Sequence, residues 1–219
     1  MLYLIATPIG NIEDITIRAL NALKQVDFVL AEDTRKASML LKRFGIDKPL
    51  ASFYEHNEPK KSPWVIDQLK KGINIALISS AGTPTISDPG FKLVRECREK
   101  SLKVVSLPGA SSIINAVALS GLRRENFAFL GFMPRKPNAR KKLLERFKNA
   151  DFALVFFESP HRLLGTLKDI GEAMGTRKIT IAREMTKKFE EVLELNVQDA
   201  LEHFKQQKPK GEFTIVVDR

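Results

Sequence analysis

Four loops in the first half of the chain carry residue types that suit the binding of a small polar ligand. They are residues 7–11 (TPIGN), 31–35 (AEDTR), 79–90 (SSAGTPTISDPG) and 108–112 (PGASS). Glycine lets the backbone approach a ligand closely, and the free N–H groups at a helix start bind polar groups. The loop 79–90 is the strongest of these signals, because so long a stretch of small and hydroxyl residues is seldom mere linkage. Residues 7–11 lack the GxGxxG pattern, which argues against a dinucleotide-binding dehydrogenase.

Several titratable side chains in or beside short motifs could move a proton. Asp33 follows a predicted strand, and His56 lies in a later loop. Asp33 is equally suited to cap the next helix, because a carboxylate accepts hydrogen bonds from its free N–H groups. Glu158 and His161 belong to a second motif, residues 158–162 (ESPHR), where His161 could equally serve a helix terminus. The residues alone leave the choice of a base open, and solvent could also take the proton.

The loops alternate with short strands and helices, a pattern typical of a parallel sheet covered by helices. Strands are predicted at residues 2–6, 28–31, 50–54, 73–79 and 103–107. Helices are predicted between them, at residues 15–26, 35–44, 63–71 and 89–100. Proline near a helix start and glycine after its end support these boundaries.

The pattern changes after residue 110, which predicts two α/β domains, residues 1–110 and 111–219. Helices are predicted at residues 111–121, 161–174 and 197–207. Strands are predicted at residues 127–131, 152–157, 178–183, 191–195 and 212–217. Consecutive strands with fewer helices between them favour a mixed sheet in the second domain, beside a mainly parallel sheet in the first.

Charge points to a polyanionic partner. The net charge is +10, and residues 123–148 hold nine basic and two acidic residues. Such a segment suits RNA or DNA, although a solvated surface of a lysine-rich protein is the alternative. No apolar run is long enough to span a membrane, and the first residues do not resemble a signal peptide. The single cysteine, Cys97, offers neither a disulfide nor a cysteine metal site, so we expect a cytoplasmic protein without a metal.

Eight motifs in chain order resemble those of the tetrapyrrole methylase superfamily, and within it the ribosomal RNA small subunit methyltransferase I branch. The matching segments are residues 7–11 with 14–16, 31–35, 56–58, 81–90, 108–109, 158–162, 183–187 and 210–212. Each motif alone is weak, but together they cover essentially the whole chain. One departure is Ser80, where members of the superfamily commonly have an aspartate.

The resemblance implies a fold and a cofactor. Its members have two α/β domains, bind S-adenosylmethionine in a cleft between them, and form homodimers. The branch methylates the ribose 2′-hydroxyl of a cytidine in 16S ribosomal RNA, so RNA or the small ribosomal subunit is the expected partner. Cofactor contacts carried over to this chain are Pro8, Ile9, Gly10, Ala81, Gly82, Thr83, Ile86, Ser111, Ser112, Ile113, Phe157 and Ala182.

The motifs also assign candidate catalytic and substrate residues. The candidate catalytic residues are His56, Asp33 and Glu184. Arginine and lysine side chains in the motifs and the basic segment suit phosphate groups, which gives Arg35, Arg140, Lys141, Lys142, Arg162, Arg183 and Lys187 as RNA contacts. Two other functions stay open, a tetrapyrrole methyltransferase and a non-catalytic RNA-binding factor for ribosome assembly.

Overall fold

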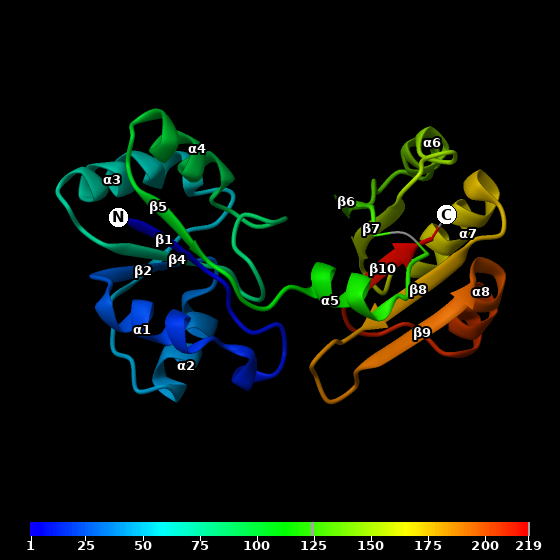
Figure 1. Ribbon diagram of the computed structural model, residues 1–219, viewed down its shortest axis with the longest axis horizontal. Coiled ribbons are helices and arrows are strands. Elements are labelled where there is room, and N and C mark those ends of the chain that lie inside the picture. Colours follow the sequence, from blue (N-terminus) through cyan, green and yellow to red (C-terminus); the bar gives the residue numbers. More distant parts are fainter. Residues whose placement is uncertain (124, 219) are drawn as a thin grey trace. The chain divides into compact units, whose positions relative to one another are not determined.

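The chain forms two compact units, each built on its own five-stranded sheet. A computed structural model describes residues 1–123 and 125–218, and the units are Met1–Ser111 and Ser112–Arg219 (Figure 1). Arg124, one of the cations in the basic segment, lies outside the described residues. Within the part of the chain that the structure describes, no helix has the length and apolar character needed to cross a bilayer.

The sheet of the first unit is entirely parallel, as the alternating pattern predicts. Its order is β3-β2-β4-β1-β5. The strands are β1 (Leu2–Ile5), β2 (Phe28–Ala31), β3 (Leu50–Ser52), β4 (Ile75–Ile78) and β5 (Val104–Leu107). The central strand β4 is buried at every residue, as expected for a strand covered on both faces.

Helices cover both faces of this sheet (Figure 1). They are α1 (Ile17–Gln25), α2 (Thr34–Arg43), α3 (Glu58–Lys70) and α4 (Phe91–Glu99), with a short 3₁₀ helix at Ile12–Asp14. One apolar cluster joins α1 and α2 to the sheet, and another joins α3 and α4 to its other face. Local capping sets two of the starts, since Thr16 accepts from Ala19 N–H and Asp33 accepts from Arg35 N–H.

The second unit has the predicted mixed sheet, with the order β6-β7-β10-β8-β9. The strands β6 and β7 are parallel, and the other neighbours are antiparallel. The strands are β6 (Phe127–Phe132), β7 (Ala153–Glu158), β8 (Lys178–Arg183), β9 (Glu191–Asn196) and β10 (Phe213–Val217). In the edge strand β9 half-buried and exposed residues alternate, which matches its period-two pattern.

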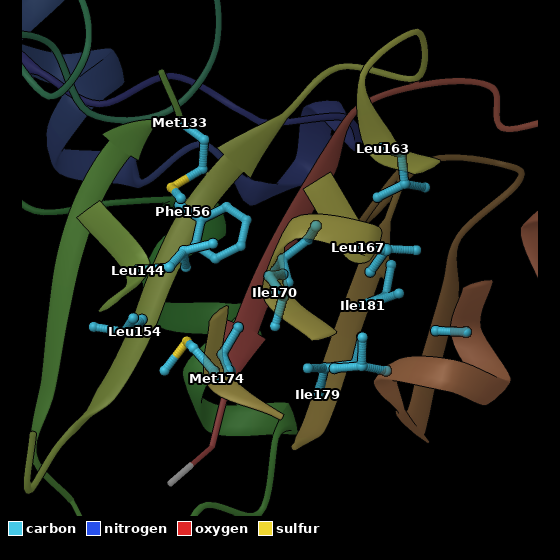
Figure 2. Close-up of a cluster of buried hydrophobic side chains, with 14 of the residues drawn as sticks. Met133, Leu144, Leu154, Phe156, Leu163, Leu167, Ile170, Met174, Ile179 and Ile181 are labelled. Carbon is cyan, nitrogen blue, oxygen red and sulfur yellow. The ribbon is translucent and has the colours of Figure 1, made fainter. Parts of the chain in front are cut away.

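The core of the second unit lies between one face of this sheet and three helices. The helices of the unit are α5 (Ser112–Leu119), α6 (Pro137–Arg146), α7 (Leu163–Met174) and α8 (Val197–Gln206). Figure 2 shows the side chains of α7 packed against Phe156 of β7 and Ile181 of β8. Helices α6 and α8 complete this cluster, while α5 packs on β7, β8 and β10 without joining it.

Two helices differ from the sequence prediction. Helix α6 occupies part of the basic segment for which we predicted no element, because a buried arginine on its inner side hides the apolar period. Helix α3 begins at Glu58 and continues through Pro63, which we placed at the helix start. A proline inside a helix loses one hydrogen bond, and here the packing of Val65, Ile66 and Leu69 against the sheet outweighs that loss.

A buried ion pair holds α6 on α7. The Nε and Nη2 atoms of Arg140 lie 2.6 and 2.5 Å from Oδ2 of Asp169, and both side chains are almost fully buried. The Nη1 atom of Arg140 also donates to the carbonyl of Pro134 at 3.2 Å. This burial corrects the prediction that Arg140 contacts RNA, because its guanidinium is buried and bound to Asp169 and to the carbonyl of Pro134.

Breaking this pair should strongly destabilise the protein. Replacing Asp169 with Asn leaves the Arg140 charge buried without a counter-charge, which we expect to lower the free energy of unfolding by about 3–5 kcal/mol. Urea denaturation measures the change. The control is Lys168→Ala, which removes only an exposed partner of Glu172 and should cost less than about 1 kcal/mol. Equal losses in the two variants would contradict the prediction.

Candidate functional site

The parallel sheet of the first unit brings the predicted ligand loops to one edge. Because all five strands run in the same direction, the segments after them begin at the same edge of the sheet. The loop after β4 leaves the sheet between the ends of β2 and β1, and the loop after β1 leaves it between β4 and β5. The candidate site therefore combines segments that lie far apart in the sequence.

Hydrogen bonds from backbone groups and hydroxyls join three of these loops. Thr7 and Gly82 exchange two bonds, with N···O distances of 2.9 and 3.0 Å. The hydroxyl of Thr7 also donates to the carbonyl of Ser79 at 3.2 Å. The hydroxyl of Thr83 donates to the carbonyl of Ala110 at 3.4 Å, which connects the loop after β4 to the loop after β5. These bonds fix the loops as one structure.

Glycines allow the loops to lie against the strand ends. A Cβ atom on Gly109 would come within 2.9 Å of the Cβ of Ala6, and one on Gly90 within 2.4 Å of Leu77 Cδ2. In the loop that contains Gly90, Thr85 and Ser87 have φ angles of 74° and 61°. Residues other than glycine rarely adopt this region. Such strain persists only where surrounding contacts enforce it, and it clusters at functional sites.

Most of the predicted cofactor residues of the first unit lie in the two loops that the Thr7–Gly82 bridge joins. Ile9 is buried, and its Cγ2 atom would be 3.4 Å from a Cβ on Gly82, while Ile86 is 43% exposed. The neighbours of Ile9 and Gly82 in these two loops are Pro8, Gly10, Ala81 and Thr83. Ser111 is the last residue of the unit. The structure thus brings this group together from two separate loops.

The remaining cofactor candidates belong to the second unit. Ser112 and Ile113 begin α5. In the sheet register, Thr214 of β10 pairs with Phe157 of β7 on one side and with Ala182 of β8 on the other. The three residues form one row across β7, β10 and β8. The assignment of Phe157 and Ala182 to a cofactor stays a prediction.

Two carboxylates beyond the predicted set lie at the edge of the first sheet. The hydroxyl of Ser80 donates to Oε2 of Glu32 at 2.7 Å, so Glu32 supplies a carboxylate beside the position where the superfamily commonly has an aspartate. Burial, together with the charge of Glu32, raises the pKa of Asp88 to about 7. A strongly raised pKa at a strand-end loop is typical of functional carboxyls. Sequence reasoning missed Asp88, because the burial that raises its pKa depends on the surrounding fold.

Each predicted catalytic residue of the first unit contacts a residue two positions away in the sequence. Asp33 caps α2, and its hydrogen bonds with the side chain and backbone of Arg35 lower its pKa. Arg35 itself is 89% exposed. His56 is exposed and contacts the ring of Tyr54 edge-on, with ring centroids 6.4 Å apart. The geometry favours capping for Asp33, while His56 stays a prediction.

The motif at residues 158–162 is a buried polar centre of the second unit. The carboxylate of Glu158 is fully buried and accepts from the hydroxyl of Thr166 at 2.5 Å and from Ser159 N–H at 2.8 Å. Its ion pair with Arg162 is 2.6 Å long, and Arg162 also donates to the carbonyl of Met133. These contacts tie the end of β7 to α7, so they favour a structural role for Arg162 over the predicted RNA contact. His161 is exposed.

The motif at residues 183–187 is also internally paired. Lys187 bridges Glu184 and Glu212, with Nζ 2.9 and 2.8 Å from their carboxylates. Although burial opposes ionisation of Glu184, the Glu212 N–H and Lys187 lower its pKa. Arg183 donates to the carbonyl of Lys210 and pairs with Glu191. These contacts favour structural roles for Arg183, Glu184 and Lys187 over the predicted catalytic and RNA-binding ones.

Helix α6 presents its remaining cations outward. Lys141 is half-buried and pairs with Glu172 and Asp169, whereas Lys142 is exposed. Among the described residues no acid forms an ion pair with the exposed cations of this helix and its flanks, which are Arg135, Lys136, Lys142, Arg146 and Lys148. The described residues contain no cluster of histidine, cysteine and acidic side chains that could hold a metal ion.

The raised pKa of Asp88 predicts a pH-dependent stability. The native carboxyl keeps its proton up to about pH 7, whereas the unfolded chain releases it near pH 4. The native state therefore binds more protons in this window, and the free energy of unfolding should fall as the pH rises through it. Asp88→Asn removes this titration, so its stability relative to the wild type should increase from pH 5 to pH 8.

Urea denaturation at both pH values tests this prediction. Asp14→Asn, at an exposed position, controls for the loss of one negative charge. A difference between Asp88→Asn and the wild type that is the same at pH 5 and pH 8 would contradict the prediction.

Two solved structures with a similar fold are a methyltransferase and a synthase. The methyltransferase CobJ superposes with a TM-score of 0.73 at 17% identity, covering 100% of this chain and 93% of that one. Diphthine synthase gives a TM-score of 0.73 at 16% identity, covering 99% and 89%. At these identities the likeness shows the fold alone, two α/β units.

Sequence comparison identifies the family. Residues 1–201 match the model of the Tetrapyrrole (Corrin/Porphyrin) Methylases. The ribosomal RNA small subunit methyltransferase I of Thermotoga maritima is 49% identical over 99% of this chain and 97% of its own length. The protein of that name from Haemophilus influenzae is 47% identical over 100% and 78%. The chain therefore belongs to the ribosomal RNA small subunit methyltransferase I family of the tetrapyrrole methylases.

Proposed function

We propose that this protein transfers a methyl group from S-adenosylmethionine to the ribose 2′-hydroxyl of a cytidine in 16S ribosomal RNA. The observation that carries the proposal is the 49% identity to the Thermotoga maritima ribosomal RNA small subunit methyltransferase I over nearly the full length of both chains. Two physical features support it, a backbone-rich loop cluster that suits a nucleoside cofactor and a cationic helix that suits RNA.

The loop cluster around the Thr7–Gly82 bridge is the proposed cofactor site. A Cβ atom on Gly90 or Gly109 would clash with Leu77 or Ala6, so these glycines let the loops pack closely on the strand ends. Exposed N–H and C=O groups suit the polar edges of a nucleoside, and Glu32 suits an ammonium group. When bound, S-adenosylmethionine supplies an electrophilic methyl group. The proposal extends to residues that the family resemblance assigns to the same cofactor: Ser112, Ile113, Phe157 and Ala182.

Asp88 is the proposed proton acceptor. A ribose hydroxyl is a weak nucleophile, and a positioned base contributes about 10²–10⁴-fold to such reactions. A base acts best when its pKa lies near the working pH, and the pKa of Asp88 is about 7. Asp33 and Glu184 are less suited, because their ion pairs hold their pKa values low. Most of the rate enhancement is expected from alignment of the hydroxyl oxygen with the methyl group, which can contribute about 7–11 kcal/mol.

The outer side of α6 is the proposed contact to the RNA backbone. Its unpaired cations can neutralise phosphates, which supplies affinity without reading the sequence. Lys142 remains in this set, whereas Arg140 leaves it because it is buried against Asp169. We also propose, from the family resemblance and the RNA substrate, that the protein is a homodimer that acts in the cytoplasm.

Methylation of small-subunit RNA tests the proposed function. The purified protein, incubated with S-adenosylmethionine and small ribosomal subunits from a strain lacking the gene, should produce 2′-O-methylcytidine in 16S RNA, as measured by mass spectrometry of nucleosides. Asp88→Asn should lower the rate at neutral pH by at least about tenfold if Asp88 takes the proton. Methylation of uroporphyrinogen without methylation of RNA would overturn the proposal in favour of a tetrapyrrole substrate.

Substitution of Thr83 should block the cofactor. A tyrosine at this position would project a ring from the loop that Thr83 links to Ala110, so we expect the affinity for S-adenosylmethionine to fall by more than about 100-fold, as for other severe losses of binding contacts. Isothermal titration calorimetry measures the affinity. Thr176→Tyr, on an exposed turn of the second unit, is the matched control. Unchanged affinity in Thr83→Tyr would remove this loop from the proposed site.

A further inference from the structure

The loop between β8 and β9 is held in one conformation. Glu184 and Thr186 have φ angles of 48° and 63°, which residues with side chains adopt only when their surroundings enforce it. The enforcing contacts are the Lys187 bridge and a reciprocal pair, in which Glu184 N–H donates to the carbonyl of Glu212 and Glu212 N–H donates to the Glu184 carboxylate. Gly211 leaves the space for this arrangement, because a Cβ there would lie 2.5 Å from Glu184 Cγ.

This rigid loop presents an aromatic ring to solvent. Phe189 is 66% exposed, although its ring is a large apolar surface. The ammonium group of Lys188 lies 5.6 Å from the centre of the ring. The loop therefore holds a flat apolar ring and a cation side by side at the surface.

The charges around Phe189 favour an anionic partner. The acids of the loop and its surroundings are engaged, since Glu190 accepts from Thr186 N–H and Glu191 pairs with Arg183. Exposed lysines without an acidic partner among the described residues remain, namely Lys188, Lys208 and Lys210. Lys210 lies beside the loop, because its carbonyl accepts from Arg183 Nε at 2.7 Å.

We propose that Phe189 stacks on an unpaired base of the RNA substrate while Lys188 and Lys210 contact its phosphates. Aromatic rings beside cations are the general means by which proteins hold single-stranded nucleic acid, because every base offers a flat face. A rigid loop favours this contact further, since little conformational entropy is lost on binding. This inference rests on the proposed function and names a contact that selects unpaired RNA.

The test compares two RNA probes. One is a 12-nucleotide single strand, and the other is the same strand annealed to its complement. We expect Phe189→Ala to weaken binding of the single strand by about tenfold, within the range measured for loss of one stacked base, with little change for the duplex. Phe189→Trp should retain the affinity for the single strand. Fluorescence anisotropy measures both affinities at one fixed salt concentration.

Two further variants separate stacking from other effects. The double variant Lys142→Glu with Arg146→Glu, on the outer side of α6, should lower the affinity for both probes. The reason is that phosphates are present in the single strand and in the duplex alike. Met39→Ala removes a side chain of similar exposure from α2 and should change neither affinity. S-adenosylmethionine binding and the unfolding midpoint should stay unchanged in Phe189→Ala.

The outcomes distinguish this inference from the proposed function. If the wild type methylates 16S RNA but Phe189→Ala binds the single strand equally well, the stacking contact is refuted alone. A change in the molecular mass of Phe189→Ala by light scattering would identify Phe189 as a contact between protein chains and would also overturn the inference. If the wild type neither binds nor methylates RNA, both proposals fail.

Discussion

Parallel strand pairing in the first unit is the constraint on which the candidate site depends. It places the carboxyl ends of all five strands at one edge, so that loops separated by more than seventy residues, such as those holding Thr7 and Gly82, exchange backbone hydrogen bonds. Those bonds satisfy part of the backbone and leave the rest available to a ligand. The loops lie close against the strand ends because Gly90 and Gly109 carry no side chain that would clash with Leu77 and Ala6.

Buried charges hold two helices together in the second unit and fix the end of β7. Burying a charge is costly unless a counter-charge and hydrogen bonds accompany it. The pairs Arg140–Asp169 and Glu158–Arg162 meet this condition, and Lys187 does the same between two carboxylates nearer the surface. Most cations of the motifs therefore form ion pairs that stabilise the second unit. Exposed cations that pair with no acid among the described residues include those on the outer side of α6 and around Phe189.

The charges of the two units suit two different ligands. The edge of the first sheet carries the carboxylate of Glu32, which would attract the cationic groups of S-adenosylmethionine. The second unit exposes cations over α6, which would attract RNA. Opposite charge at each surface raises the rate of encounter and opposes binding of the wrong ligand. This division supports the proposed reaction, in which a cationic donor meets an anionic acceptor.

The sequence by itself determined the features that depend on near neighbours and on the order of elements. The alternation of strands and helices predicted both sheets, and short motifs located the loops, including the cap formed by Asp33. Only the tertiary structure decided which charged residues point inward. Arg140 finds its partner on another helix, and the pKa of Asp88 rises because distant segments bury it beside Glu32. A local pattern records the type of a side chain, whereas its burial and its partners arise from segments that meet only when the chain folds.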